Sequence, residues 1–280
     1  MFTELNSILD IGKEGKLSNE FLVLSDDGSV DGTFVIHHFL SLFLKSNRVC
    51  FLSLTQSFAH YQNVAKKLGT NLSDAKTENK LTFVEGLREL GNCLVGTVDN
   101  ETQQSSVLES GAGNPFYHVL QNSLPQLFKH LKSKVEGLEN VDKTPVTLII
   151  DNLSVLLTIG VTVKEVLSFI HYLRAYILNR GLCSGSLVLF TNNGNTFEDE
   201  VNSSVWKYLT HSASLILEVS GLSSGYCREV HGELMITWPE STNRRKKKKK
   251  FQYKLSEKNV SFFALGCLQL FYDLLFIHYL

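Results

Sequence analysis

The strongest constraint on the fold is a series of short apolar segments, each ended by a polar turn and followed by a helical pattern. These segments lie within residues 21–27, 48–54, 80–86, 144–157 and 186–193. Apolar runs of about four to eight residues that alternate with helical patterns are typical of a parallel sheet covered by helices on both faces. The sequence therefore predicts an α/β fold with a mainly parallel central sheet.

The segments between these strands carry the spacing of helices. Residues 33–46 are apolar almost all round, which predicts a helix enclosed by other elements rather than one on the surface. Further helices are predicted over residues 57–69, from Pro125 to Gly137 and over residues 163–179. Residues 87–115 are polar and contain four glycines, and we expect a loose surface loop there.

The pattern changes after residue 212. Residues 215–220, 232–238 and 251–255 alternate or run apolar, with short turns between them, which predicts an antiparallel meander at the C-terminal end of the sheet. The basic run Arg244 to Lys250 is expected in the turn between two of these strands.

Composition places the chain among globular proteins. Apolar residues make up 43% of the 280 residues, and five cysteines without a C-x-x-C pair exclude a disulfide scaffold and a zinc ribbon. The N-terminal residues lack the pattern of a signal peptide, and there is no run of 18 apolar residues. We therefore expect no membrane association and an intracellular location, cytoplasmic or also nuclear.

Charge is nearly balanced, with 27 basic and 28 acidic residues, but it is unevenly distributed. Seven positive charges follow one another at Arg244, Arg245, Lys246, Lys247, Lys248, Lys249 and Lys250. This basic run has three interpretations: a solvated loop, a nuclear-import signal or an arm that contacts RNA phosphates. No aromatic residue interrupts it, so base stacking within it is not supported. The solvated loop is favoured, and RNA contact is the second hypothesis.

The turn after the first predicted strand stands where a phosphate-binding P-loop would lie. A P-loop has the pattern G-x-x-x-x-G-K-[ST], in which the lysine neutralises phosphate and the hydroxyl binds magnesium. In the same register this chain has Asp27 for the first glycine, Gly32 for the second, Thr33 for the lysine and Phe34 for the hydroxyl residue. The turn is a degenerate P-loop, whose aspartates would repel a polyphosphate.

Asp151 ends the segment VTLIID, which contains four apolar residues and has the form of a Walker B strand, whose aspartate lies near magnesium in working enzymes. The alternative is a buried strand that ends in a polar turn.

Two further patterns are weaker. Ser223, between Gly221 and Gly225, matches a nucleophile elbow but lacks the following helix, so a hairpin is the better interpretation. His37 and His38 are adjacent on a helix and are expected in a core or an interface, without a metal.

Six segments in order resemble the sixth subunit of the Elongator complex, of the vertebrate type. They are FVIHHFLSLFLKSN, RVCFLSLTQSFAHYQNVAKKLG, LSVLLTIG, VLSFIHYLRA, GLSSGYCREVHGELMITW and FQYKLSEKNVSFFALG. The resemblance covers about residues 20–266 and implies a RecA-like P-loop NTPase fold as one domain over residues 1–266. Residues 267–280 form a hydrophobic tail outside the family pattern.

The resemblance also implies a function by assembly. Family members combine with the paralogous Elongator subunits four and five into a hexameric ring, which joins the larger catalytic subcomplex and binds tRNA for wobble-uridine modification. RecA-like enzymes place a catalytic glutamate just after the second core strand, where this chain has Thr55, Gln56 and Ser57. We therefore expect a non-catalytic subunit without a cofactor, with Asp151 as a structural relic. The alternative is an ATPase or sensor that binds nucleotide through an altered loop.

Overall fold

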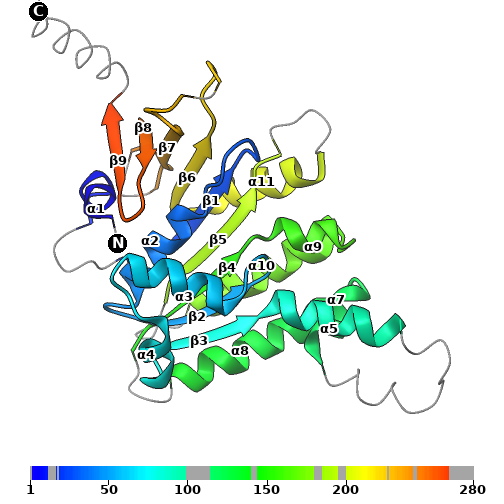
Figure 1. Cartoon of the computed structure of the whole chain (residues 1–280). Helices are drawn as coiled ribbons and strands as arrows, with labels where there is room; N and C mark the ends of the chain where they lie inside the picture. Colours follow the sequence, from blue (N-terminus) through cyan, green and yellow to red (C-terminus); the bar gives the residue numbers. More distant parts are fainter. Residues whose placement is uncertain are drawn as a thin grey trace, which may run out of the picture.

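The computed structural model describes residues 2–11, 17, 19–98, 114–139, 144–179, 185–194, 200–225, 227–241 and 245–264. Within these residues nine strands form one sheet in the order β3-β2-β4-β5-β1-β6-β7-β8-β9 (Figure 1). The strands are β1 (Phe21–Asp26), β2 (Arg48–Ser53), β3 (Leu81–Glu85), β4 (Val146–Asp151), β5 (Leu187–Asn192), β6 (Leu215–Ser220), β7 (Gly232–Trp238), β8 (Lys247–Leu255) and β9 (Val260–Ala264).

The sheet is parallel from β3 to β6 and antiparallel from β6 to β9. Strand β4 places Ile149 opposite Phe51 of β2 and Val188 of β5, and all three side chains are buried. Buried strands of this kind are expected when helices cover both faces. The predicted α/β fold, with a mainly parallel sheet and antiparallel C-terminal strands, is confirmed.

Two layers of helices enclose the sheet because successive strand residues point to opposite faces. Leu22 and Leu24 of β1 pack in the cluster beneath one layer, whereas Phe21 and Val23 pack in the cluster beneath the other. The first layer contains α1 (Thr3–Ile8), α2 (Phe34–Phe43), α3 (Phe58–Lys67) and α4 (Leu72–Thr77). The second contains α5 (Gly86–Val98), α7 (Pro115–Leu120), α8 (Pro125–Glu139), α9 (Ser154–Thr158), α10 (Val163–Leu178) and α11 (Glu200–Ser212).

Helix α2 is buried along its whole length, as its composition predicts. Every residue from Phe34 to Phe43 is buried, including His37 and His38. The helix packs with the sheet, with Tyr61 of α3 and with Phe2 at the N-terminus. It begins directly after the loop that joins it to β1, so its burial fixes the position of that loop.

The prediction of a loose loop over residues 87–115 is wrong for its first part, where α5 extends from Gly86 to Val98. Gly91 and Gly96 lower helix propensity, but Leu87, Leu90 and Leu94 keep helical spacing, and Leu90 is buried in the core. Tertiary packing therefore outweighs the two glycines. Residues 99–113 lie outside the described part of the chain.

The prediction that the basic run lies in a turn is also wrong, because Lys247 to Lys250 form the first part of β8. Alternate strand residues point to opposite faces, so neighbouring lysines are separated by the sheet. Arg245 and Lys246 precede the strand. Arg244 and the hydrophobic tail 267–280 lie outside the described residues.

Candidate functional site

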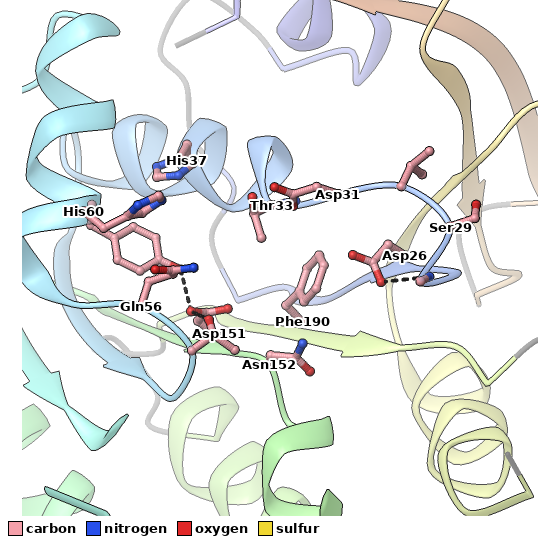
Figure 2. A pocket seen from close by; sticks show the side chains of 14 residues that line it. Asp26, Ser29, Asp31, Thr33, His37, Gln56, His60, Asp151, Asn152 and Phe190 are labelled. Atoms are coloured by element: carbon pink, nitrogen blue, oxygen red, sulfur yellow. Dashed lines mark hydrogen bonds between the residues drawn. The ribbon is translucent and has the colours of Figure 1, made fainter. Parts of the chain in front are cut away.

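A cleft of about 440 Å³ lies at the carboxyl ends of β1, β2 and β4, beside the start of α2 (Figure 2). This edge is where open α/β sheets bind their ligands. Figure 2 shows Asp26 and Asp31 toward one end of the cleft and Gln56 and His60 toward the other. The lining residues are Asp26, Gly28, Ser29, Val30, Asp31, Thr33, His37, Thr55, Gln56, His60, Tyr61, Asp151, Asn152 and Phe190.

The loop from Asp26 to Thr33 binds its own backbone amides with its own carboxylates. Asp26 accepts the amide of Gly28 through Oδ1 at 3.3 Å and the amide of Gly32 through Oδ2 at 3.2 Å. Asp27 Oδ1 accepts the amide of Ser29 at 3.0 Å, and Asp31 Oδ1 accepts the amide of Thr33 at 2.8 Å. In a P-loop such amides point at phosphate oxygens. In this loop the backbone amides donate to aspartate oxygens instead.

The two glycines of this loop are required for its shape. Gly28 has a φ of +75°, in the left-handed region that glycine adopts at little cost. Gly32 is required for space: a Cβ added there would lie 3.0 Å from the Cβ of Asp26 and 3.3 Å from that of Val219. The loop therefore lies close against β6, and a glycine at position 32 is required for packing.

The electrostatics of the loop are unfavourable to an anion. Burial raises the pKa of Asp26 above its ordinary value, and the nearby Asp31 and Asp27 raise it further, against hydrogen bonds from Gly32 and Gly28 that lower it. Phe34 is buried, with its ring centroid 5.0 Å from that of Tyr253. The residue in the position of the magnesium-binding hydroxyl therefore belongs to the core.

Asp151 is fully buried at the end of β4, where hydroxyl groups hold one of its oxygens. Oδ2 accepts hydrogen bonds from Tyr61 at 2.6 Å, from Ser53 at 3.3 Å and from Thr55. Burial raises the pKa of Asp151, although the hydrogen bonds from Thr55, Tyr61 and Ser53 lower it. The sequence singled out neither Ser53 nor Tyr61, whose helical spacing indicated only a core position.

The segment after β2 forms one side of the cleft, which Thr55 and Gln56 line. Gln56 lines the cleft, and its backbone carbonyl accepts a hydrogen bond from Ser53 at 2.6 Å. Ser57 caps α3 by accepting the amide of His60 at 3.3 Å. Neither an amide nor a hydroxyl at these positions is a general base at neutral pH.

Comparison with known proteins decides the family. The family model described as Elongation complex protein 6 matches residues 2–257. The chain belongs to this family.

Curated members of the family match over nearly their full lengths. Elongator complex protein 6 of Rattus norvegicus is 40% identical over 272 residues, which cover 95% of this chain and 98% of the relative. The human protein of the same name is 36% identical over 276 residues, with the same coverage. The tail 267–280 lies beyond the residues that the family model matches.

A solved structure supports the fold. A KaiC-like protein from the hyperthermophilic archaeon Pyrococcus horikoshii superimposes with a TM-score of 0.53, at 12% identity, over 88% of this chain and 90% of that one. At this identity the likeness concerns the fold alone. The RecA-like prediction is confirmed at that level.

The remaining sequence candidates lie in structural positions of this Elongator complex protein 6 family member. His37 and His38 are buried, as predicted, and burial lowers their pKa values to about 4 and about 3. Ser223 lies in the connection between the antiparallel strands β6 and β7, so the predicted hairpin is confirmed. The amide of Gly221 donates to Asp27 Oδ2 and to Ser29 Oγ, both at 3.2 Å, and joins this connection to the loop.

Among the described residues, no cluster of three or more His, Cys, Asp or Glu side chains could hold a metal ion. No described helix is both long and apolar enough to cross a bilayer. The described lysines of the basic run lie on and beside β8 and do not line the cleft.

Proposed function

We propose that this chain is a non-catalytic subunit of Elongator that works by assembly. It combines with the paralogous RecA-like subunits four and five into a hexameric ring with two copies of each, and the ring joins the larger catalytic subcomplex. The ring binds tRNA and supports modification of the wobble uridine, in the cytoplasm and also the nucleus. Membership of the Elongator complex protein 6 family supports this assignment.

The observation that carries the non-catalytic part is the self-bonded loop. Four amides between Gly28 and Thr33 already donate to Asp26, Asp27 and Asp31. A nucleotide phosphate would have to displace those carboxylates and then lie beside them without a lysine. Both the broken hydrogen bonds and the like-charge repulsion oppose binding.

The hydroxyl cluster around Asp151 supports the same conclusion. A Walker B aspartate acts on magnesium from an open cleft. Here the carboxylate oxygen that faces Thr55 and Tyr61 accepts hydrogen bonds from side chains of the same domain. Its role is to join the ends of β2 and β4 to α3.

Nucleotide titration separates this proposal from the altered ATPase or sensor. A fluorescent ATP analogue with magnesium should show no saturable binding to the full chain. Thr33→Glu, which adds a negative charge beside the cleft, and Thr70→Glu, which adds the same charge outside it, form a matched pair. Saturable binding that unlabelled ATP displaces, and that only Thr33→Glu abolishes, would overturn the non-catalytic assignment.

Assembly is tested by affinity purification of the tagged full chain from vertebrate cells, with mass spectrometry of the recovered proteins. We expect two RecA-like partners in amounts equal to the chain, with the larger Elongator subunits in smaller or salt-sensitive amounts. A parallel purification of the chain without residues 267–280 separates the effect of the tail from that of the domain. If RecA-like partners are recovered with neither the full chain nor the shortened chain, the proposed assembly is refuted.

A further inference from the structure

A second concave surface lies on the opposite face of the sheet from α1, between α11 and the antiparallel strands. This groove has a volume of about 420 Å³. Helix α11 contributes Trp206, Lys207, Thr210 and His211, and the strands contribute Ile216, Glu218 and Thr237. Lys246 and Lys248 close the side formed by β8, with Pro239 beside them. We call it the α11 groove.

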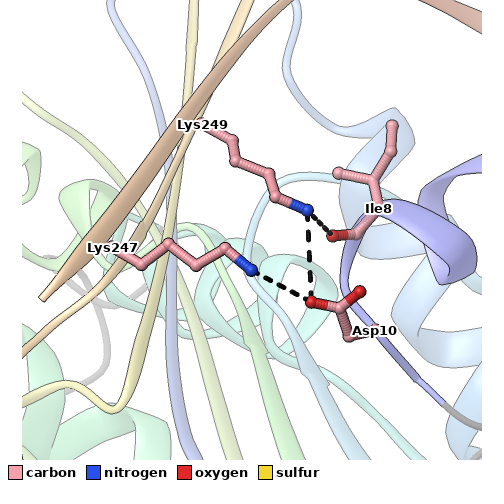
Figure 3. Close-up of polar contacts among 4 residues, drawn as sticks. All are labelled: Ile8, Asp10, Lys247 and Lys249. Atoms are coloured by element: carbon pink, nitrogen blue, oxygen red, sulfur yellow. Dashed lines mark hydrogen bonds and ion pairs between the residues drawn. The ribbon is translucent and has the colours of Figure 1, made fainter. Parts of the chain in front are cut away.

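Strand geometry divides the basic run between the two faces of the sheet. Lys247 and Lys249 lie on the face of α1, where both ammonium groups lie over the ring of Trp238, at 5.1 and 5.5 Å from its centroid. Both also contact Asp10, at 3.2 and 4.0 Å, and Lys249 donates to the carbonyl of Ile8 at 3.2 Å (Figure 3). These two lysines are therefore engaged in holding the N-terminal segment.

Lys248 lies on the other face, toward the α11 groove, because it alternates with Lys247 and Lys249 along the strand. Lys250 shares that face, but it forms an ion pair with Glu233 at 2.7 Å. In the part of the chain that the structure describes, no carboxylate lies within ion-pair distance of Lys207, Lys246 or Lys248, and all three are exposed. The groove thus presents three ammonium groups outside any direct ion pair.

The remaining lining of the groove suits a nucleic acid strand. Trp206 supplies the large aromatic ring of the lining; it is partly buried, with the indole packed against the hydrophobic core, and His211 is exposed. The single carboxylate in the lining, Glu218, is partly buried, and burial raises its pKa against the opposing effect of Lys248. Positive charge that follows a backbone, next to an aromatic ring, is typical of surfaces that bind single-stranded nucleic acid.

We propose that the α11 groove binds a single-stranded segment of RNA, with Lys207, Lys246 and Lys248 on the phosphates and Trp206 stacked on a base. The inference rests on the proposed function, in which the assembled ring binds tRNA, and assigns part of that binding to this chain. The proposal also divides the basic run by role. Lys247 and Lys249 hold the N-terminal segment, whereas Lys246 and Lys248 contact the RNA. An acidic peptide would satisfy the lysines but not the flat aromatic surface.

The basic run supplies a matched pair of variants for the test. Lys246→Ser with Lys248→Ser, and Lys247→Ser with Lys249→Ser, remove the same charge from the same segment. Binding of fluorescent tRNA to the purified assembly is measured over a series of salt concentrations. The first pair should weaken binding about tenfold near physiological salt and lower the slope of log K against log salt by about 1.4, or about 0.7 for each phosphate that a lysine no longer neutralises.

The second pair should leave affinity and salt slope unchanged, while faster hydrogen exchange over residues 3–10 reports that Asp10 and Ile8 are no longer held. At the groove, Trp206→Leu should bind RNA at least about fivefold more weakly than Trp206→Phe, which keeps an aromatic ring. Equal melting temperatures of the assemblies show that folding is not the cause.

The outcomes distinguish the groove from the ring. If the unaltered assembly binds no tRNA, the proposed function itself fails. If it binds tRNA and both lysine pairs weaken binding equally, or neither does, the groove assignment is overturned while the ring function stands. If a poly-glutamate peptide displaces tRNA equally well from the unaltered assembly and from the groove variants, the groove assignment is also overturned.

Discussion

Tyr61 of α3 donates its phenolic hydrogen to Oδ2 of Asp151 at the end of β4, over 2.6 Å, and both residues are buried. The bond joins a helix of the first layer to β4 at the cleft, which both residues line. Burial raises the pKa of both groups. The pair is therefore an internal structural contact between α3 and β4.

Tyr61→Phe should destabilise the chain by about 1–3 kcal/mol at neutral pH, because it leaves a buried carboxylate with one donor fewer. The cost should be smaller near pH 4. A carboxyl group whose pKa is raised on folding contributes stability at low pH that is lost as the pH rises, and the missing hydrogen bond raises that pKa further. Urea unfolding at both pH values measures the difference.

Tyr172→Phe is the matched control, because that tyrosine is 59% exposed on α10. It should change the free energy of unfolding by less than about 0.5 kcal/mol. An equal cost of Tyr61→Phe at pH 4 and pH 7 would mean that Asp151 does not depend on the phenol for its ionisation.

The strands and the buried helix α2 could be predicted from the sequence, because burial on both faces leaves an uninterrupted apolar run. The run around Ile149 and the mostly apolar helix around Phe39 are examples. Helix α5 was missed because Gly91 and Gly96 weaken a local signal that packing of Leu90 restores. The first part of β8 was missed because a run of lysines lacks the apolar pattern of a strand. Its pairing with β7 depends on residues distant in the sequence.

The candidate site was predictable in position but not in its bonding. The aspartates of the loop indicated repulsion of phosphate, and their residue types could not show that Asp26 accepts amides two and six residues away. That bonding depends on the path of the loop against β6. Tyr61 and Asp151 are 90 residues apart in the chain and meet only through the parallel crossover.

Asp26→Ala should loosen the loop, because it removes the acceptor of two amides, from Gly28 and Gly32, at a partly buried position. Each unpaired donor costs about 1 kcal/mol or more, so we expect a loss of roughly 1–3 kcal/mol of stability. Hydrogen exchange of residues 28–33 should accelerate. Asp31→Ala removes the acceptor of the single amide of Thr33 and should affect that amide alone. Equal acceleration in both variants would contradict the central role of Asp26.

His37 should make the chain sensitive to acid. Burial lowers its pKa from 6.5 to about 4, with a further decrease from His60 and an opposing increase from Asp31. A base whose pKa falls on folding contributes stability above its unfolded pKa that is lost as the pH falls. The free energy of unfolding should therefore decrease as the pH falls from 6.5 to 4. The contribution of His37 to this slope corresponds to at most one additional proton bound by the unfolded state.

His37→Phe should reduce that decrease, because a phenyl ring keeps the contact with Tyr61, whose centroid lies 5.0 Å away, and does not titrate. Denaturant unfolding across this pH range provides the measurement. His171→Phe, at an exposed position of α10, is the control. If both variants keep the slope of the unaltered chain, His37 is not its source.

Helix α5 presents apolar side chains that the described part of the domain does not cover. Leu87 and Val95 are 45% and 63% exposed, and their spacing of eight residues places them on one face. In a subunit that assembles, such a face is expected to meet a partner. Leu87→Glu with Val95→Glu should therefore reduce recovery of the RecA-like partners at least about tenfold, because burying a charge in an apolar interface is costly.

Val201→Glu, at a residue 47% exposed on α11, adds a charge to another apolar surface position and serves as the control. Partner recovery from tagged full-length variants is quantified by mass spectrometry, and circular dichroism of the isolated chains checks that each is folded. Full recovery with both α5 substitutions would place the interface elsewhere. Loss of the partners with Val201→Glu alone would place the interface beside α11. The α11 groove would then have to stay accessible in the assembly for the RNA proposal to hold.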